Sequence, residues 1–338
     1  MSLIAGRFKT RKHLGEGTYG IVYQADDVIA KQTVALKKFR NRKAEDGIDY
    51  NTIQEIRQLA ELDHTNICHF FGVFPSEDTI FIATEFLPFS LDAMIHCKDE
   101  SKILTERHIK CIMKMILEGV DYLHKNWILH RDLKPANMLL STDGILKLID
   151  FGLSTDYPPD FGPMLSQVVT QWYKAPELCF GAKFYGPAID IWSVGCIFAE
   201  MLLNRPFLPG ANDIEELQLI ANTFGTILWD GCDKIPSFIE VKPKIPVTPL
   251  GDLFSAVKDR TAIDLLVDLM TLDPSKRISA EHALNHPYFE SDPLPCLPSE
   301  LPLPDIGAVG GLSTSLMTGA TTTRTKYAPG TTLLSFRK

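Results

Sequence analysis

Four polar residues in the middle of the chain have types and spacings suited to phosphate chemistry. Asp132 is followed by Lys134 and Asn137, and Asp150 lies farther along. Carboxylate and amide oxygens are the ligands that magnesium prefers, so Asn137 and Asp150 are candidate metal ligands. Asp132 could accept or orient the proton of an attacking hydroxyl group. Lys134 could steady a phosphate during its transfer.

A glycine-rich stretch near the start of the chain, residues 14–22, could contact phosphates. Gly15, Gly17 and Gly20 would let the backbone approach a phosphate without a Cβ clash. A plain turn between two strands explains the stretch about as well. The same spacing also begins dinucleotide-binding folds, but a helix follows there, whereas residues 21–23 favour a strand.

Lys37 ends an apolar, strand-like run, residues 34–37. A lysine inside such a run is costly unless its charge is paired. We expect Lys37 to contact the α- and β-phosphates of a nucleotide and to pair with Glu55 on the next helix. A surface lysine and a surface glutamate are the alternative interpretation of these two residues taken alone.

The apolar pattern predicts two regions of different character. Residues 8–39 and 67–87 are rich in β-branched and aromatic residues and predict strands. Residues 49–62 predict a helix with Ile53, Ile56, Leu59 and Ala60 on one apolar face. The chain beyond is mostly helical in pattern: residues 109–123 have the spacing of a buried helix, and residues 188–203, 212–224, 261–271 and 279–285 also predict helices.

Composition limits the classes of partner. The chain has 338 residues and a formal net charge of −8, which argues against nucleic acid as a main partner. The longest apolar stretch, residues 189–203, contains Asp190 and Glu200 and is too short for a bilayer, so no membrane association is expected. The seven cysteines form no Cys-x-x-Cys pair, which favours reduced thiols and a cytoplasmic or nuclear location.

Taken in order, the glycine-rich stretch, Lys37, Glu55, Asp132, Asn137, Asp150 and residues 175–177 resemble a eukaryotic protein kinase. The resemblance implies an α+β fold with two lobes. A small antiparallel β-sheet lobe with one main helix and the hinge would span residues 1–87. A larger, mostly α-helical lobe would span residues 88–304, and residues 305–338 would form a flexible Gly/Ser/Thr-rich tail.

The resemblance also assigns a site for ATP and Mg²⁺. It makes Asp132, Lys134, Lys37 and Glu55 the catalytic set and Asn137 and Asp150 the metal ligands. The implied ATP-binding residues are Leu14, Gly15, Glu16, Gly17, Thr18, Tyr19, Gly20, Val22, Ala35, Lys37, Thr84, Glu85, Leu87 and Leu139. Thr18 and Tyr19 are either inhibitory phosphorylation sites or ordinary residues of a loop tip.

Further stretches resemble the cyclin-dependent kinases over about residues 8–290. They include residues 16–20, 34–38, 85–87, 168–173 and 192–201; residues 127–130, 180–183 and 299–304 are most similar to the cyclin-dependent-kinase-activating and cell-cycle-related branch. The implied function is proline-directed transfer of the ATP γ-phosphate to serine or threonine of protein substrates. A pseudokinase or scaffold is the alternative, and the intact catalytic residues argue against it. A segment typical of peptide binding, residues 153–177, disfavours a small-molecule kinase.

A cyclin-like regulatory subunit is the partner that the resemblance implies. In this family the cyclin contacts the helix expected at residues 49–62. Ile53 would then be an exposed apolar anchor for the partner, and packing in the core is the equal alternative. The sequence names neither the cyclin nor the substrates.

The chain departs from the family where an activating phosphate is usually bound. Leu165, with Ser166 beside it, occupies the position of the phosphothreonine. Arg131 is one of the three arginines that normally bind this phosphate, but the other two positions hold Gln54 and Thr155. We therefore expect phosphorylation of this segment to be absent or weak, and a partner to order the segment instead.

Two further substitutions bear on specificity. Thr84 replaces the phenylalanine that usually closes the back of the adenine pocket, which predicts room for bulky inhibitors. Lys174 replaces an arginine that helps to hold the proline-selecting pocket, and lysine lacks the two-pronged guanidinium. The resemblance also implies a structural Glu177–Arg277 ion pair and a role for Asp190 in bracing the catalytic loop.

Overall fold

The computed structural model describes most of the chain. The described residues are 3–16, 20–39, 50–76, 79–157 and 162–304. Gly17, Thr18 and Tyr19 of the expected ATP site lie outside them, as does the expected tail at residues 305–338.

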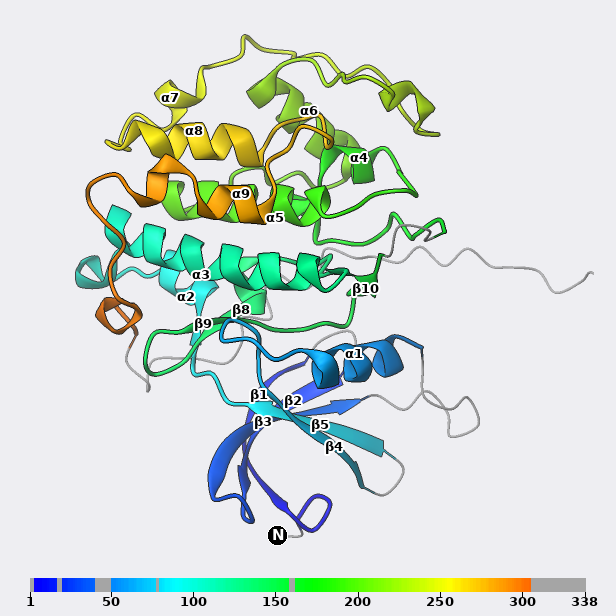
Figure 1. Ribbon diagram of the computed structural model, residues 1–338, viewed down its shortest axis with the longest axis vertical. Helices are drawn as coiled ribbons and strands as arrows, with labels where there is room; N and C mark the ends of the chain where they lie inside the picture. Colours follow the sequence, from blue (N-terminus) through cyan, green and yellow to red (C-terminus); the bar gives the residue numbers. More distant parts are fainter. Residues whose placement is uncertain (1–2, 17–19, 40–49, 77–78, 158–161, 305–338) are drawn as a thin grey trace, which may run out of the picture.

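The first lobe is an antiparallel sheet with one helix packed against it (Figure 1). The strands are β1 (Phe8–Glu16), β2 (Gly20–Asp27), β3 (Gln32–Phe39), β4 (Phe70–Ser76) and β5 (Thr79–Glu85), in the order β1-β2-β3-β5-β4. The helix α1 runs over Tyr50–Glu61. The predicted strand-rich region and the predicted helix are therefore confirmed.

The two faces of β3 serve different purposes. Val34 and Leu36 are fully buried in a small core with Phe8, Phe81 and other residues of the sheet. Successive side chains of a strand point to opposite faces, so Ala35 and Lys37 lie on the face turned toward α1 and the second lobe. The alternation along β3 thereby places a lysine in the space between the lobes.

The second lobe is mainly helical (Figure 1). Its helices are α2 (Leu91–Ile95), α3 (Glu106–Lys125), α4 (Pro176–Cys179), α5 (Ala188–Leu203), α6 (Asp213–Phe224), α7 (Leu250–Leu253), α8 (Arg260–Leu269) and α9 (Ala280–Leu284). Short strands are β6 (Phe89–Ser90), β7 (Ile128–Leu129), β8 (Met138–Leu140), β9 (Leu146–Leu148) and β10 (Thr155–Asp156). Single 3-10 turns include η2 (Pro135–Asn137) and η3 (Gln171–Tyr173).

The helix α5 is the centre of this lobe. Its residues from Ile189 to Met201 are all buried, including Asp190 and Glu200. A helix that is buried all round belongs to a large core, and α3 and α8 pack beside it. None of the helices in the described part of the chain is long and apolar enough to cross a membrane.

The predicted apolar face of α1 is partly wrong. Leu59 is buried, but Ile53 is 50% exposed and Ala60 is also exposed. The buried stripe instead contains Glu55 and Gln58, which are 3% and 0% exposed. Hydrophobic periodicity missed this stripe because α1 buries polar groups that bond across the space between the lobes.

Residues 292–304, the last described segment, pack on the second lobe. The Cys296 amide donates to the Arg107 carbonyl of α3 at 3.2 Å, and Arg107 pairs with Glu300 at 3.1 Å. Leu301 is buried nearby. The proline-rich sequence therefore covers the outside of α3.

Candidate active site

Lys37 lies between two carboxylates from different parts of the chain. Its Nζ is 2.6 Å from Glu55 Oε1 on α1 and 3.3 Å from Asp150 Oδ1, which follows β9. Burial opposes the lysine charge, but Asp150 and Glu55 outweigh it and raise the pKa of Lys37. The predicted Lys37–Glu55 pair is present, and the alternative of two surface charges is excluded.

Asp150 is held as an anion in an unusual backbone conformation. Burial opposes its charge, yet the nearby Lys37 and Lys134 lower the pKa of the Asp150 carboxyl. Its backbone φ angle is 63°, in the left-handed region that residues other than glycine rarely adopt. Such strain is kept where the surrounding structure fixes a functional side chain. The result is a carboxylate aimed at the space next to Lys37.

Asp132 receives four hydrogen bonds from three residues. Lys134 Nζ and Asn137 Nδ2 donate to Oδ2 at 2.8 and 3.0 Å. Thr170 donates to Oδ1 through its amide at 3.1 Å and its hydroxyl at 2.7 Å. Lys134 also donates to the Thr170 hydroxyl at 2.9 Å. The expected residues are brought together, but the role of Thr170 was missed because its contact with Asp132 is purely tertiary.

The Asn137 side chain is oriented for metal binding. Its Nδ2 donates to the Asp132 carbonyl at 2.8 Å as well as to the carboxylate, so both N–H bonds are used and the amide oxygen is the atom left as a ligand. The Ile149 amide donates to the Asn137 carbonyl at 3.0 Å, which places Asn137 beside the Asp150 turn. An amide oxygen and a carboxylate fit the hard-oxygen preference of Mg²⁺.

Asp190 braces the loop that carries Asp132. Its carboxylate accepts the backbone amides of His130 and Arg131, each at 2.9 Å, and lies 3.0 Å from His124 Nε2. Burial opposes the charge, but these bonds lower the pKa of Asp190. Arg131 has a φ of 63°, so the two amide bonds hold a strained turn in place. The predicted bracing role agrees with this geometry.

The Glu177–Arg277 pair is also present. Two guanidinium nitrogens donate to the two carboxylate oxygens of Glu177 at 2.8 and 3.1 Å, in the fork geometry that arginine favours. Both side chains are buried. The pair joins α4, at the end of the substrate-binding segment, to the chain before α9.

The described residues of the expected ATP site lie on neighbouring strands of the first lobe, after β5 and in β8. Gly15 pairs with Val22, Val22 with Lys37, and Ala35 with Thr84 in the sheet register. A Cβ at Gly20 would lie 2.2 Å from the Lys38 carbonyl oxygen, so only glycine fits there. The remaining expected residues take part through their elements: Leu14 and Glu16 in β1, Glu85 in β5, Leu87 after β5 and Leu139 in β8.

The segment after Asp150 contacts α1 and the end of α3. Ser154 Oγ donates to the buried Gln58, and Arg57 pairs with Asp156. The Tyr157 hydroxyl donates to the His124 carbonyl at 2.8 Å. The position of α1 and the path of this segment are therefore linked, which local sequence patterns did not reveal.

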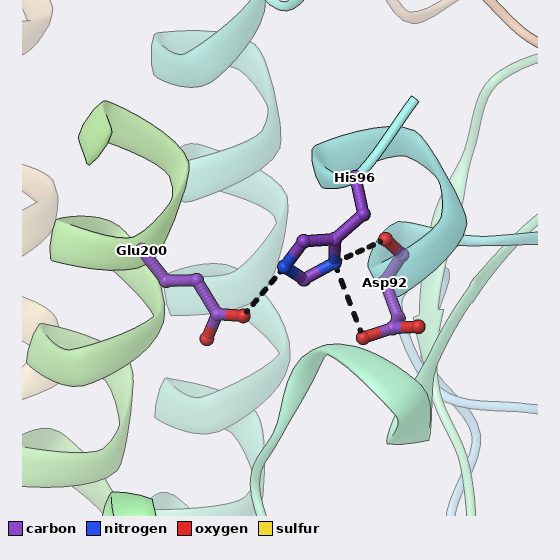
Figure 2. Close-up of side chains that lie close together, drawn as sticks. All are labelled: Asp92, His96 and Glu200. Atoms are coloured by element: carbon purple, nitrogen blue, oxygen red, sulfur yellow. Dashed lines mark hydrogen bonds and ion pairs between the residues drawn. The ribbon is translucent and has the colours of Figure 1, made fainter. Parts of the chain in front are cut away.

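In the described part of the chain, one group of side chains could be considered for a metal ion: Asp92, His96 and Glu200. Their possible ligand atoms lie within 4.8 Å of one another. Figure 2 shows that the two ring nitrogens of His96 face different carboxylates. Nδ1 lies 3.5 Å from Asp92, and Nε2 lies 3.6 Å from Glu200. This arrangement fits a bridging imidazole rather than a shared metal ion. Glu200 also accepts the Tyr173 hydroxyl at 2.7 Å, which fixes the η3 turn.

Comparisons with known proteins agree with this site. A family profile described as "Protein kinase domain" matches residues 8–289, and the chain belongs to that family. Cyclin-dependent kinase 7 of Dictyostelium discoideum is 44% identical over 298 residues, which cover 86% of this chain and 82% of the relative. The serine/threonine-protein kinase KIN28 of Saccharomyces cerevisiae is 38% identical, covering 87% and 97%.

The fold is shared with a solved complex. A chain in the structure of the CAK complex from Chaetomium thermophilum bound to ATP-gamma-S superposes with a TM-score of 0.81 at 37% identity, covering 88% of this chain and 96% of that one. These similarities confirm the cyclin-dependent kinase resemblance and its activating-kinase branch. The activity is therefore that of a serine/threonine protein kinase.

Proposed function

We propose that Asp132, Lys134, Asn137 and Asp150 carry out phosphoryl transfer and that Lys37 holds the ATP phosphates. The observation that carries this proposal is the set of four hydrogen bonds on Asp132, which fixes its carboxylate between Lys134, Asn137 and Thr170. The oxygen of a serine or threonine hydroxyl attacks the γ-phosphorus and its proton passes to Asp132. The bond from the γ-phosphorus to the β–γ bridging oxygen breaks, and ADP leaves.

Asn137 and Asp150 would hold Mg²⁺, which supplies neutralisation of the phosphate charge when it is bound. Their oriented amide oxygen and ionised carboxylate support this assignment. Lys37 and Lys134 are two cations near Asp150 that lower the pKa of its carboxyl. The chain thus surrounds the phosphates with positive charge while Asp132 remains available to the hydroxyl.

The natural partner is a cyclin-like subunit that binds α1. Ile53 is 50% exposed on this helix, so the alternative of core packing does not apply. The same helix carries Glu55, which pairs with Lys37. Binding of a partner at α1 would therefore act directly on the nucleotide site.

Substrates have proline after the target serine or threonine. Val169, in the peptide-binding segment, has a φ of 70°, a strained conformation for a β-branched residue. Lys174 is buried and donates to Asp213 at 2.7 Å, so it keeps a charge-assisted bond although it lacks the arginine fork. Both features favour a rigid, specialised groove next to Thr170.

The test is the rate of γ-phosphate transfer to matched Ser-Pro and Ser-Ala peptides. Asp132→Asn should lower kcat by about 10²–10⁴ because it removes the proton acceptor. Asp143→Asn, an exposed carboxylate in the turn between β8 and β9, is the matched control and should match wild type. Full activity of Asp132→Asn would contradict the assigned mechanism, and equal rates on the two peptides would contradict proline direction.

A further inference from the structure

The Tyr185 hydroxyl joins Arg131 to the segment that usually carries the activating phosphate. Arg131 Nη1 donates to the Tyr185 hydroxyl at 3.1 Å, and this hydroxyl donates to the backbone carbonyl of Leu165. Leu165 occupies the phosphothreonine position. We call the set of Arg131, Tyr185 and Leu165 the Tyr185 bridge.

The hydrogen bonds of the bridge are chemically consistent. A tyrosine hydroxyl has one proton to donate and oxygen lone pairs to accept with, and here it does both. Arg131 Nε donates separately to the Leu153 carbonyl at 2.6 Å. The arginine therefore contacts the start of the segment directly, at Leu153, and is joined to its later part, at Leu165, through the Tyr185 hydroxyl.

A second bond holds the same part of the segment. The Met164 amide donates to the Lys183 carbonyl at 2.7 Å, so residues 164–165 lie against residues 183–185. The Leu165 side chain is 74% exposed and adds little packing, which leaves its backbone carbonyl as the group that is held. A few residues later the chain reaches Thr170, which bonds Asp132 and Lys134.

We propose that Tyr185 is a positioning residue whose neutral hydroxyl takes the place of the phosphate in tying the activation segment to Arg131, so that the peptide groove forms without phosphorylation. This inference rests on the proposed kinase function and deepens it. Burial raises the pKa of Tyr185, although Arg131 opposes the shift, so the hydroxyl keeps its proton at neutral pH. The bridge therefore needs no modification of the chain, whereas a phosphate is added and removed.

The first experiment compares Tyr185→Phe with wild type in the full chain bound to its cyclin-like partner. Phenylalanine keeps the ring and removes only the hydroxyl. The kcat/KM for the peptide should fall about tenfold, because a bond to a charged donor is lost, while the KM for ATP should stay the same. Tyr122→Phe is the matched control, since that hydroxyl accepts the Asp63 amide at 3.0 Å outside the segment.

The second experiment is a rescue that a merely structural tyrosine would not show. Leu165→Glu places a carboxylate where the phosphate would be, within reach of Arg131. In the Tyr185→Phe background it should recover most of the lost peptide kcat/KM, and in wild type it should change little. No rescue, or an equal loss in the peptide and ATP parameters, overturns the proposal.

Failure of the inference is distinguishable from failure of the proposed function. If the Ser166→Ala variant no longer phosphorylates the peptide, a phosphate on the segment is needed. The proposal that the segment works without a phosphate would then be wrong. Wild-type peptide kcat/KM for Tyr185→Phe, with Ser166→Ala still active, would show that the segment is phosphate-independent but is not held by Tyr185.

Discussion

Thr84 faces the nucleotide space from β5. It is the cross-strand partner of Ala35, and Ala35 shares its face of β3 with Lys37. We expect the adenine to lie next to this position, where a threonine would leave volume that a phenylalanine would fill. The size of this side chain therefore limits how large an ATP-site inhibitor can be.

Replacing Thr84 with phenylalanine tests this limit. Thr84→Phe should weaken the binding of inhibitors with a bulky group behind the adenine by about tenfold or more, because the added ring occupies that volume. The measurement is the Kd of a graded inhibitor series, with the Kd of ATP as the internal control. Equal inhibitor affinities for the two proteins would show that no such volume exists.

Glu216 is a second residue whose environment has a measurable consequence. It is fully buried, Oε2 accepts the Gly210 amide at 3.0 Å, and Oε1 has no hydrogen-bond partner among the described residues. Burial raises the pKa of Glu216 to about 9, against 4.5 in the unfolded chain. The folded protein therefore keeps a proton that the unfolded chain releases.

This difference predicts a pH-dependent stability. Between pH 4.5 and about 9 the folded state binds more protons, so the Glu216 contribution to stability is present below pH 4.5 and is lost as the pH rises. Glu216→Gln keeps the bond to Gly210 and stays neutral. Its unfolding free energy should exceed that of wild type by more than about 1 kcal/mol at pH 9 and by little at pH 4.5. A constant difference across this range would contradict the assignment.

At the residue scale, sequence reasoning identified the groups that do chemistry but not all the groups that hold them. Lys37, Asp132, Asn137 and Asp150 belong to short motifs with fixed spacing, so the sequence could mark them as candidates, and the structure places Lys37 near Asp150 and Asn137 beside Asp132. Thr170 and Tyr185 act through contacts that depend on how distant segments meet. No local spacing or periodicity marks such contacts.

The helix α1 shows the same contrast at the scale of an element. Its helical character and bounds were predicted, whereas its buried face was not, because Glu55 and Gln58 turn inward to Lys37 and Ser154. Apolar periodicity assigns polar residues to the outside. A helix that buries carboxylate and amide groups, and exposes an isoleucine, is one that serves contacts beyond its own lobe.

The exposed isoleucine of α1 predicts the partner interface. Ile53→Ser should weaken binding of a cyclin-like subunit by at least tenfold, because a central apolar anchor is lost. The stability of the isolated chain should change by less than about 0.5 kcal/mol, since the side chain is half exposed. Binding by titration calorimetry or size-exclusion chromatography would measure the first effect.

The matched control is Ile29→Ser, in the turn between β2 and β3, where the side chain is 68% exposed. It removes a similar apolar group from the same lobe but from a different surface. Equal losses of partner binding for the two variants would contradict an interface centred on Ile53.

At the scale of the whole molecule, part of the first lobe packs into the core of the second, while the outer face of its sheet keeps a small core of its own. Phe39, Leu59 and Ile82 of the first lobe belong to the same buried cluster as Leu148 and the helices of the second. Lys37 reaches Asp150 across the same boundary. Composition and pattern predicted the two regions, but not that their packing would be continuous.

The activation segment is the part of the molecule whose control differs most from that of its family. It is tied to α1 by Gln58, to the catalytic loop by Thr170 and to Arg131 by the Tyr185 bridge. At these three points the segment itself contributes neutral groups: the Ser154 hydroxyl, the Thr170 hydroxyl and the Leu165 carbonyl. We therefore expect the kinase to work without a phosphate on this segment.

The most direct test is the peptide kcat/KM of phosphatase-treated protein, with its partner bound, for wild type and Ser166→Ala. Mass spectrometry would verify that residues 153–177 carry no phosphate. We expect treated wild type, untreated wild type and Ser166→Ala to agree within about twofold. The bond from Arg131 to the Tyr185 hydroxyl involves no phosphate, so all three proteins keep it. A fall of tenfold or more after phosphatase treatment, or in Ser166→Ala, would contradict it.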